Sequence, residues 1–471
     1  MNALDFARLQ FGITTIFHFL FVPMTIGLTA WVALCETRWY RTRDEIYLRM
    51  TRYWGKFMLI SVAIGVVTGI VMEFQFGMNW SLYSRYVGDI FGSPLAMEGL
   101  IAFFLESTFV GVWIFGWDRI SPKLHVVSAW LVAIGTTLSA YFILVANSWM
   151  QHPVGYKIDP KTHHAYLTNI FAVLFNPTAW LAYPHVIFAA FTTAALLVVG
   201  ISAWQLYRKR HVEIFSRSAK MALPIGLVAV ILSGIFGDGQ GRLLEQEQPM
   251  KMAAAEALYN TSDHACFSLF ATASFTAHPK RLSADVCIPD LESLIATLNP
   301  NGTVKGMNQI NAAEQKKYGP GNYMPPVGVT YWSFRLMVGA GILMFLLAFV
   351  GVVASRRPGW LERMPRWFYV SALVGVFLPI IANWSGWIFT EVGRQPWVVF
   401  GLLKTSQANS PDVSLASIVI SLAAYVLLYG FLITVGARLF IREIKRGPSD
   451  DPPGPDGEQS EGSRPDLLLA Y

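Results

Sequence analysis

The stretch LAMEGLIAFFLESTFVGVWIF, residues 95–115, is long and apolar enough to cross a membrane as one helix, and so predicts a membrane protein. It nevertheless carries Glu98 and Glu106, and a carboxylate at mid-bilayer depth costs roughly 3 kcal/mol unless it is partnered, protonated or beside water. On a regular helix the two glutamates lie about 12 Å apart along the axis and about 80° apart around it. They can therefore line one side of a polar path; the alternative is two carboxyls hydrogen-bonded inside a helix bundle.

The composition of the whole chain agrees with this stretch. Of 471 residues, 54% are hydrophobic and only 14% are charged, and the mean hydropathy is +0.43. A soluble domain averages about 25% charged residues, so the composition predicts an all-α polytopic membrane protein. The net charge of +6 comes with no basic and aromatic patch, so no nucleic-acid partner is expected. The N-terminal residues MNALDFARLQFG lack a charged n-region and a cleavage site, so no removable signal peptide is expected either.

Apolar runs of about 20 residues predict the membrane-spanning helices. We expect nine of them, at residues 12–35, 54–75, 95–116, 124–147, 180–206, 219–236, 333–354, 367–390 and 415–438.

The basic residues predict the orientation of these helices. They gather in alternate loops, at Arg38, Arg41, Arg43, Arg49, Arg52, Arg208, Lys209, Arg210, Arg217, Lys220, Arg356, Arg357, Arg363, Arg366, Arg438, Arg442, Lys445 and Arg446. The other loops are poor in them: residues 76–94 contain only Arg85, and residues 148–179 only Lys157 and Lys161. Because Lys and Arg accumulate on cytoplasmic loops, the N-terminus is expected outside and the C-terminus in the cytoplasm.

Two segments are predicted to lie outside the membrane. Residues 237–332 form one long outer loop between a first helical part, 1–236, and a second, 333–446. Residues 447–471 are acidic and rich in Pro and Gly, so we expect a disordered cytoplasmic tail.

Several polar or sulfur-bearing side chains map to the outer half of five different predicted helices: His18, Glu98, His185, Met337 and Glu391. A neutral imidazole suits haem iron, and one His with one Met is a known axial pair. Each residue also has a plainer interpretation, since a buried histidine is usually a satisfied core residue. Arg335, two residues before Met337, could place a fixed cation near an iron; its alternative is snorkelling to the outer interface. For Glu391 the alternative to binding a metal is an ion pair with Arg394.

The motifs around these residues resemble subunit I of the bacterial cytochrome bd-type quinol oxidases. The resemblance covers nearly the whole chain apart from parts of the outer loop and the tail. It is carried by RLQFGITTIFHFLFVP, GKFMLISVAIGVVTGIVMEFQFGMNW, YVGDIFGSPLAMEGLIAFFLESTFVGVWIFGWDR, LVANSWMQHPVG, YWSFRLMVG and EVGRQPW. Motifs of this length are highly specific.

The resemblance implies two haem b groups and one haem d. His185 and Met337 match the axial ligands of a low-spin haem b, with Arg335 beside it. His18 matches the ligand of haem d and Glu391 that of a high-spin haem b, although the family leaves room for the opposite assignment. Glu98 matches a carboxylate at the haem d site and is a candidate ligand to its iron. The remaining cofactor-site matches are Asn147, Trp387 and Arg394.

A proton path and a quinol site are implied in the same way. Glu106 and Ser107 match a path that brings cytoplasmic protons to the oxygen site. Lys251 and Glu256 match quinol-site residues in the outer loop. This loop is short, which indicates the short-loop form of the family. Its sequence does not indicate which quinone is used. The implied activity is oxidation of quinol at the outer face and reduction of O2 to water, with charge separated without a pump.

The sequence leaves two other functions open. A transporter or channel that couples protons through Glu98 and Glu106 explains the carboxylates but not the clustered haem-ligand residues. The second alternative is a relative of the family that holds only b-type haems, which would use every haem ligand named above.

In the implied bacterial cytoplasmic membrane, the expected partners are a second subunit, small single-helix subunits and lipid. Cys266 and Cys287 both fall in the outer, oxidising region, so a disulfide between them is expected.

Overall fold

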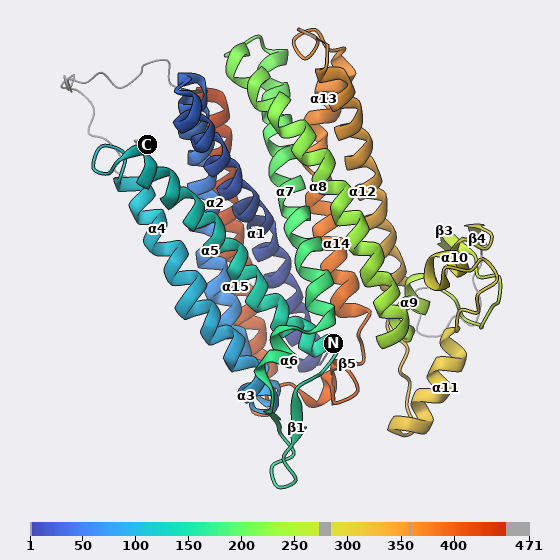
Figure 1. Cartoon of the computed structure of the whole chain (residues 1–471). Coiled ribbons are helices and arrows are strands. Elements are labelled where there is room, and N and C mark those ends of the chain that lie inside the picture. Colours follow the sequence, from blue (N-terminus) through green and yellow to red (C-terminus); the bar gives the residue numbers. More distant parts are fainter. Residues whose placement is uncertain (1, 273–283, 358, 449–471) are drawn as a thin grey trace.

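The structure is a computed structural model that describes residues 2–272, 284–357 and 359–448. Its described residues form a bundle of long helices with a smaller lobe at one side of one end (Figure 1). The predicted tail at 447–471 lies outside the described residues except for Gly447 and Pro448.

Within these described ranges, nine helical segments are long and apolar enough to cross a membrane, as the apolar runs predict. Seven are single helices: α1 (Ala3–Thr42), α2 (Glu45–Met78), α5 (Pro122–Gln151), α7 (Pro177–Tyr207), α8 (Val212–Glu247), α12 (Val327–Ser355) and α15 (Leu415–Arg446). One is composite, because α3 (Ser81–Met97) runs through the π-helix η1 (Glu98–Phe103) into α4 (Phe104–Phe115). The remaining span, the eighth along the chain, is made of two helices: α13 (Arg366–Gly375) is followed after a short break by α14 (Leu378–Val392).

The helices are longer than the apolar runs from which they were predicted. Helix α8 continues to Glu247 and α12 begins at Val327, so the segment outside these two helices is 248–326 rather than 237–332. Residues 81–94, predicted as loop, are helical in α3. Hydropathy marks the part of a helix that suits lipid, whereas backbone hydrogen bonding continues until a cap or proline ends it. For α8 that end is Gln248, followed by Pro249.

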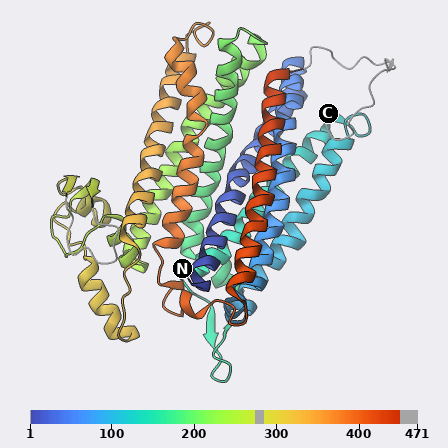
Figure 2. The same cartoon turned by 180° about the vertical axis from the view of Figure 1, so that it is seen from behind.

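The bundle is organised around α1 and α7, which pack against each other and against α5. Helix α2 also packs along α1, α8 along α7, and α12 along α14. From behind, α15 (red in Figure 2) lies along α1 and α2. The aromatic residues Tyr53, Trp54, Phe57 and Phe215 form a buried core near the arginine-rich ends of these helices.

The remaining elements lie at the end of the bundle where the chain begins (Figure 1). They include three antiparallel hairpins: β1 (Tyr156–Ile158) with β2 (Ala165–Leu167), β3 (Phe267–Thr272) with β4 (Ala284–Ile288), and β5 (Trp397–Val399) with β6 (Leu403–Lys404). The short helices are α6 (Ile170–Leu174), α9 (Pro249–Ala255), α10 (Leu291–Thr297), α11 (Met307–Tyr318) and the 3-10 helix η2 (Thr405–Gln407).

Candidate functional site

His18 of α1 is held in one tautomer by α2. Its Nδ1 lies 2.9 Å from the hydroxyl of Thr68, and that hydroxyl donates its own hydrogen to the backbone carbonyls of Ile64 and Gly65. The hydroxyl must therefore accept a hydrogen from His18 Nδ1, which leaves Nε2 with a free lone pair. Gly69 lies against the same ring, where a β-carbon would come within 3.3 Å of Cε1.

His185 of α7 is oriented in the same manner by α8. Its Nδ1 lies 2.8 Å from the backbone carbonyl of Ser233, and a carbonyl can only accept, so Nδ1 carries the hydrogen. Its Nε2 is again left free as an acceptor. Gly237 adjoins this ring too, where a β-carbon would come within 3.2 Å of it. A histidine whose other nitrogen donates to a fixed acceptor is the usual arrangement of a metal-ligating imidazole.

Met337 of α12 lies opposite Gly386 of α14, where a β-carbon would come within 3.0 Å of the sulfur. Two residues before it, Arg335 Nη2 lies 2.5 Å from Glu256 Oε2, and only 8% of the arginine side chain is exposed. Its guanidinium also lies over the rings of Phe267, Tyr331 and Phe334, at 4.6 to 5.1 Å. Arg335 is thus buried in an ion pair, and the snorkelling interpretation is wrong.

Glu391 ends α14 and accepts a hydrogen bond of 2.9 Å from Asn147 Nδ2 of α5. It also forms the ion pair with Arg394 that was the plainer interpretation of the sequence. Trp387, one turn earlier, packs edge-on against Phe19 with ring centroids 5.1 Å apart. Next to these residues lies a largely apolar cavity of about 470 Å³, whose lining includes Phe11, Trp80, Met150, Trp387, Glu391 and Arg394.

These features fit haem groups. The two histidines present unprotonated nitrogens, three glycines leave room at the rings and the sulfur, and an apolar cavity adjoins a carboxylate. Bound haem supplies one-electron and oxygen chemistry.

The glutamates of residues 95–115 lie at a local irregularity of the helix. Glu98 is the first residue of η1 and accepts a hydrogen bond of 2.6 Å from Ser139 Oγ of α5. Because a π-helix turns less per residue than an α-helix, the angle of about 80° from Glu98 to Glu106 does not apply here. Glu106 is buried with its backbone against Gly135, and the two carboxyls interact electrostatically. Ser107 differs from them, since its side chain is exposed and donates to the carbonyl of Phe103.

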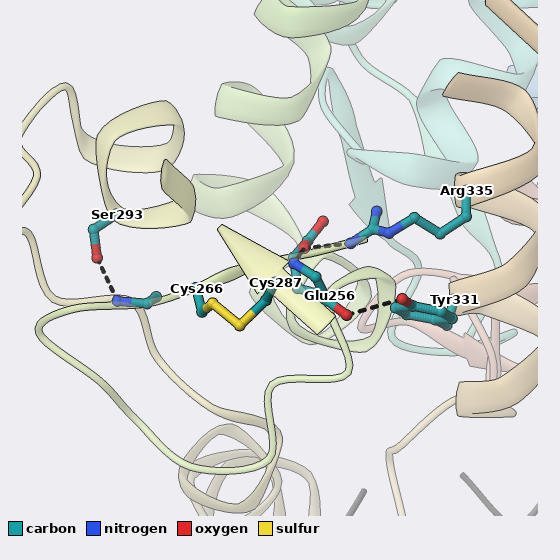
Figure 3. The surroundings of a disulfide bond; sticks show 8 residues. Glu256, Cys266, Cys287, Ser293, Tyr331 and Arg335 are labelled. Carbon is teal, nitrogen blue, oxygen red and sulfur yellow. Dashed lines mark hydrogen bonds and ion pairs between the residues drawn. A yellow bond between two sulfur atoms is a disulfide. The ribbon is translucent and has the colours of Figure 1, made fainter. Parts of the chain in front are cut away.

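Lys251 and Glu256 lie at the two ends of α9 and contact different partners. Lys251 Nζ lies 3.0 Å from the carbonyl of Thr390 and 3.2 Å from Gln151 Oε1. Burial, then the nearby guanidinium of Arg394, lowers the pKa of Lys251 to about 7. Glu256 accepts a hydrogen bond of 3.3 Å from the backbone N–H of Ser268 in addition to its ion pair with Arg335 (Figure 3).

Three further polar residues adjoin these sites and were missed in the sequence. Gln151 and Gln248 are hydrogen-bonded at 2.9 Å beside Lys251, and Glu73 of α2 acts electrostatically on Glu98. Glu73 is a charged residue within an otherwise apolar run, and this pattern alone could have identified it as a candidate site residue. Gln151 and Gln248 lie in polar stretches at helix ends, where the sequence does not distinguish them.

Cys266 and Cys287 are joined by a disulfide across the hairpin of β3 and β4 (Figure 3). Beside it, Ser293 of α10 accepts a hydrogen bond of 2.8 Å from the backbone N–H of Ala265, and Ser268 Oγ lies 2.8 Å from the hydroxyl of Tyr331. The hairpin thus connects α10 to α12 and to Glu256. The third cysteine, Cys35, is buried and free.

Fold and site together define a multi-pass helical membrane protein whose buried histidine, methionine and glutamate side chains are of the types that bind haem iron. The family model described as cytochrome bd terminal oxidase subunit I matches residues 6–448, and the chain belongs to this family. It is therefore a subunit of a bacterial membrane-bound quinol:oxygen oxidoreductase with haem cofactors and a second subunit as partner.

Known relatives match along nearly the whole chain. Cytochrome bd ubiquinol oxidase subunit 1 of Bacillus subtilis (strain 168) is 47% identical over 452 residues, which cover 96% of this chain and 95% of the relative. Cytochrome bd-II ubiquinol oxidase subunit 1 of Escherichia coli (strain K12) is 36% identical over 95% of this chain and 97% of its own length. The solved bd oxidase from Geobacillus thermodenitrificans superimposes with a TM-score of 0.86 at 29% identity, covering 95% of this chain and 99% of that one.

Proposed function

We propose that His185 and Met337 hold a low-spin haem b, that His18 holds haem d, and that Glu391 holds a high-spin haem b. The observation that carries this proposal is the pair of histidines whose Nδ1 atoms are bonded to fixed acceptors, so that each Nε2 is free to bind iron. Arg335, two residues from Met337, is proposed to lie beside this haem, with its positive charge balanced by the Glu256 carboxylate.

Glu106 and Glu98 are proposed as the proton path to the oxygen site. Glu106 is buried and electrostatically linked to Glu98, and Glu98 is oriented by Ser139. With the arginine-rich ends in the cytoplasm, protons for water formation cross much of the bilayer through these carboxyls. Each charge that crosses is worth about 2.3 kcal/mol per 100 mV, so the reaction generates proton motive force without a pump.

Quinol oxidation is proposed at the segment 248–326, on the outer side of the membrane. Glu256 is the candidate proton acceptor, because its carboxylate lies beside the buried Arg335. Lys251, with a pKa lowered to about 7, is the candidate group that binds a quinol oxygen from the other end of α9. This segment is the short form of the family's loop, and subunit II with small single-helix subunits completes the complex.

The experiment that tests the haem assignment is a reduced-minus-oxidised visible spectrum of the purified complex, with haem extraction. A chlorin band in the red together with b-type bands is expected. A spectrum with only b-type bands would identify the protein as a quinol oxidase of the family that lacks haem d. The proposed iron ligands would then be unchanged, with a b-type haem at His18. No haem at all would overturn the proposal and return Glu98 and Glu106 to the transporter hypothesis.

A further inference from the structure

The lobe beside α12 contains a buried carboxyl to which neither the family resemblance nor the proposed function gives a role. Glu292 of α10 is 1% exposed, and neither of its carboxyl oxygens has a hydrogen-bond partner among the described residues. A buried polar group without a partner is expensive, so it calls for a functional explanation.

Glu292 is held firmly in place by its neighbour. Ser293 is fully buried and bonds to Ala265 twice, through its backbone N–H at 3.3 Å and its hydroxyl at 2.8 Å. Ala265 precedes the disulfide residue Cys266, so α10 is anchored to the hairpin that also contacts Glu256 (Figure 3).

The charged groups that face Glu292 come from the elements around α10. They are Glu245 of α8, Glu256 after α9 and Arg335 of α12, while β3 carries no ionisable side chain. Arg335 Nη2 pairs with Glu256, and its Nε and Nη1 have no hydrogen-bond partner in the described part of the chain. Glu245 has Lys305 as a cationic neighbour, so Glu256 and Glu292 share the one guanidinium of Arg335, and Glu245 adds a third carboxyl. Such a cluster accepts a further proton readily, because like charges in a buried site disfavour full ionisation.

We propose that Glu292 is the second proton acceptor of quinol oxidation, which receives the protons that Glu256 takes from quinol and releases them to the water outside. The inference rests on the proposed quinol site at Glu256. In each of two steps one quinol O–H bond breaks and its proton goes to the Glu256 carboxylate. That proton passes to ionised Glu292 and then to water. The two electrons continue to oxygen through the oxidase reaction, and quinone is the product.

The pH dependence follows from this role. Burial, then the charges of Glu256 and Glu245, raises the pKa of Glu292 to about 8. Above that pH the carboxyl is ionised and ready to accept a proton, whereas below it the carboxyl must first lose the proton it holds. The rate of quinol oxidation is therefore expected to rise with pH through this range.

The test is Glu292→Gln in the complete complex, with quinol-oxidase rates measured from pH 6 to 9. Oxygen uptake with ascorbate and tetramethyl-p-phenylenediamine, which reduces haem without quinol, is measured in parallel. We expect quinol oxidation at the highest pH to fall at least about tenfold, the rise with pH to vanish, and the diamine rate to stay unchanged. The matched control is Asp290→Asn at the start of the same helix, since the Asp290 side chain reaches solvent and, in the described part of the chain, bonds to His264 at 2.9 Å.

Two further variants separate the outcomes. Glu292→Asp keeps a carboxyl and should retain the rise with pH; an Asp variant that behaves like Gln would assign Glu292 a packing role and overturn the inference. If Glu292→Gln leaves the pH dependence of quinol oxidation unchanged, the role of Glu292 is rejected. If Glu256→Gln abolishes quinol oxidation in the same experiment, the proposed quinol site is retained. Full quinol oxidation in Glu256→Gln would instead reject the proposed quinol site.

Discussion

At the scale of single residues, the hydrogen bonds that a polar side chain already makes within the membrane-embedded part of the site determine which of its atoms can still bind iron. Thr68 donates to its own helix and so must accept from His18, which determines the tautomer of a candidate iron ligand. A hydroxyl on the neighbouring helix α2, 2.9 Å away in space and 50 residues away in sequence, thus determines what His18 can bind.

Thr68→Val tests this dependence. Valine has nearly the same shape but cannot accept from Nδ1, so a buried N–H loses its partner at a cost of about 1–3 kcal/mol. We expect the haem at His18 to bind roughly 10–100-fold more weakly, seen as a lowered haem content per protein. Thr68→Ser restores the hydroxyl and should restore the haem; equal haem content in all three proteins would contradict the role.

Glu106→Gln tests the proton path. The amide fills the same buried space but cannot carry a proton, so oxygen uptake should fall at least about tenfold while the haem spectrum is unchanged. Glu213→Gln, at an exposed position in the first turn of α8, is the control. Oxygen uptake at the normal rate in Glu106→Gln would reject the relay.

At the scale of elements, glycines determine how closely neighbouring helices approach the candidate ligands. Gly237 of α8 lies against His185 of α7, whereas Gly234, one turn earlier, has no atom near the position of a β-carbon. Both glycines lie in one helix, so they form a matched pair for substitution.

Gly237→Ala should displace the His185 ring, because its methyl group would come within 3.2 Å of it. We expect a shifted low-spin haem b spectrum and a severalfold slower quinol oxidation. Gly234→Ala gains the same helix propensity, about 1 kcal/mol, without touching the ring. Identical spectra for the two variants would mean that α8 does not constrain His185.

The hairpin of β3 and β4 should behave as a disulfide-closed element. Without reductant, neither Cys266 nor Cys287 should react with an alkylating reagent, and after reduction both should. Cys35 is buried and should react only on unfolding. Two freely alkylated thiols in the unreduced protein, located by peptide mass, would exclude the disulfide.

At the scale of the whole molecule, the basic loops gather at one end of the bundle and the hairpins and lobe at the other (Figure 1). This segregation is what charge-dependent insertion produces. The predicted orientation places the arginine-rich end in the cytoplasm and the lobe outside.

Cysteine labelling in intact cells tests that orientation. Lys161→Cys, exposed between β1 and β2, should react with a membrane-impermeant maleimide added outside. Arg210→Cys, exposed between α7 and α8, should react only after the membrane is permeabilised. The reverse pattern would invert the topology and, with it, the direction of the proposed proton path.

Much of this molecule follows from local sequence. The membrane-spanning helices are predictable because about 20 apolar residues suffice to span lipid. His18, His185 and Glu391 stand out as polar residues in apolar runs, whereas Met337, one of 16 methionines, is indicated only by the family resemblance. What the sequence could not determine depends on distant partners: the tautomers of His18 and His185, the ion pair of Arg335 with Glu256, the π-turn at Glu98, and the burial of Glu292. These depend on atoms tens of residues away that only packing brings together, because hydrogen bonding and desolvation act over a few ångströms.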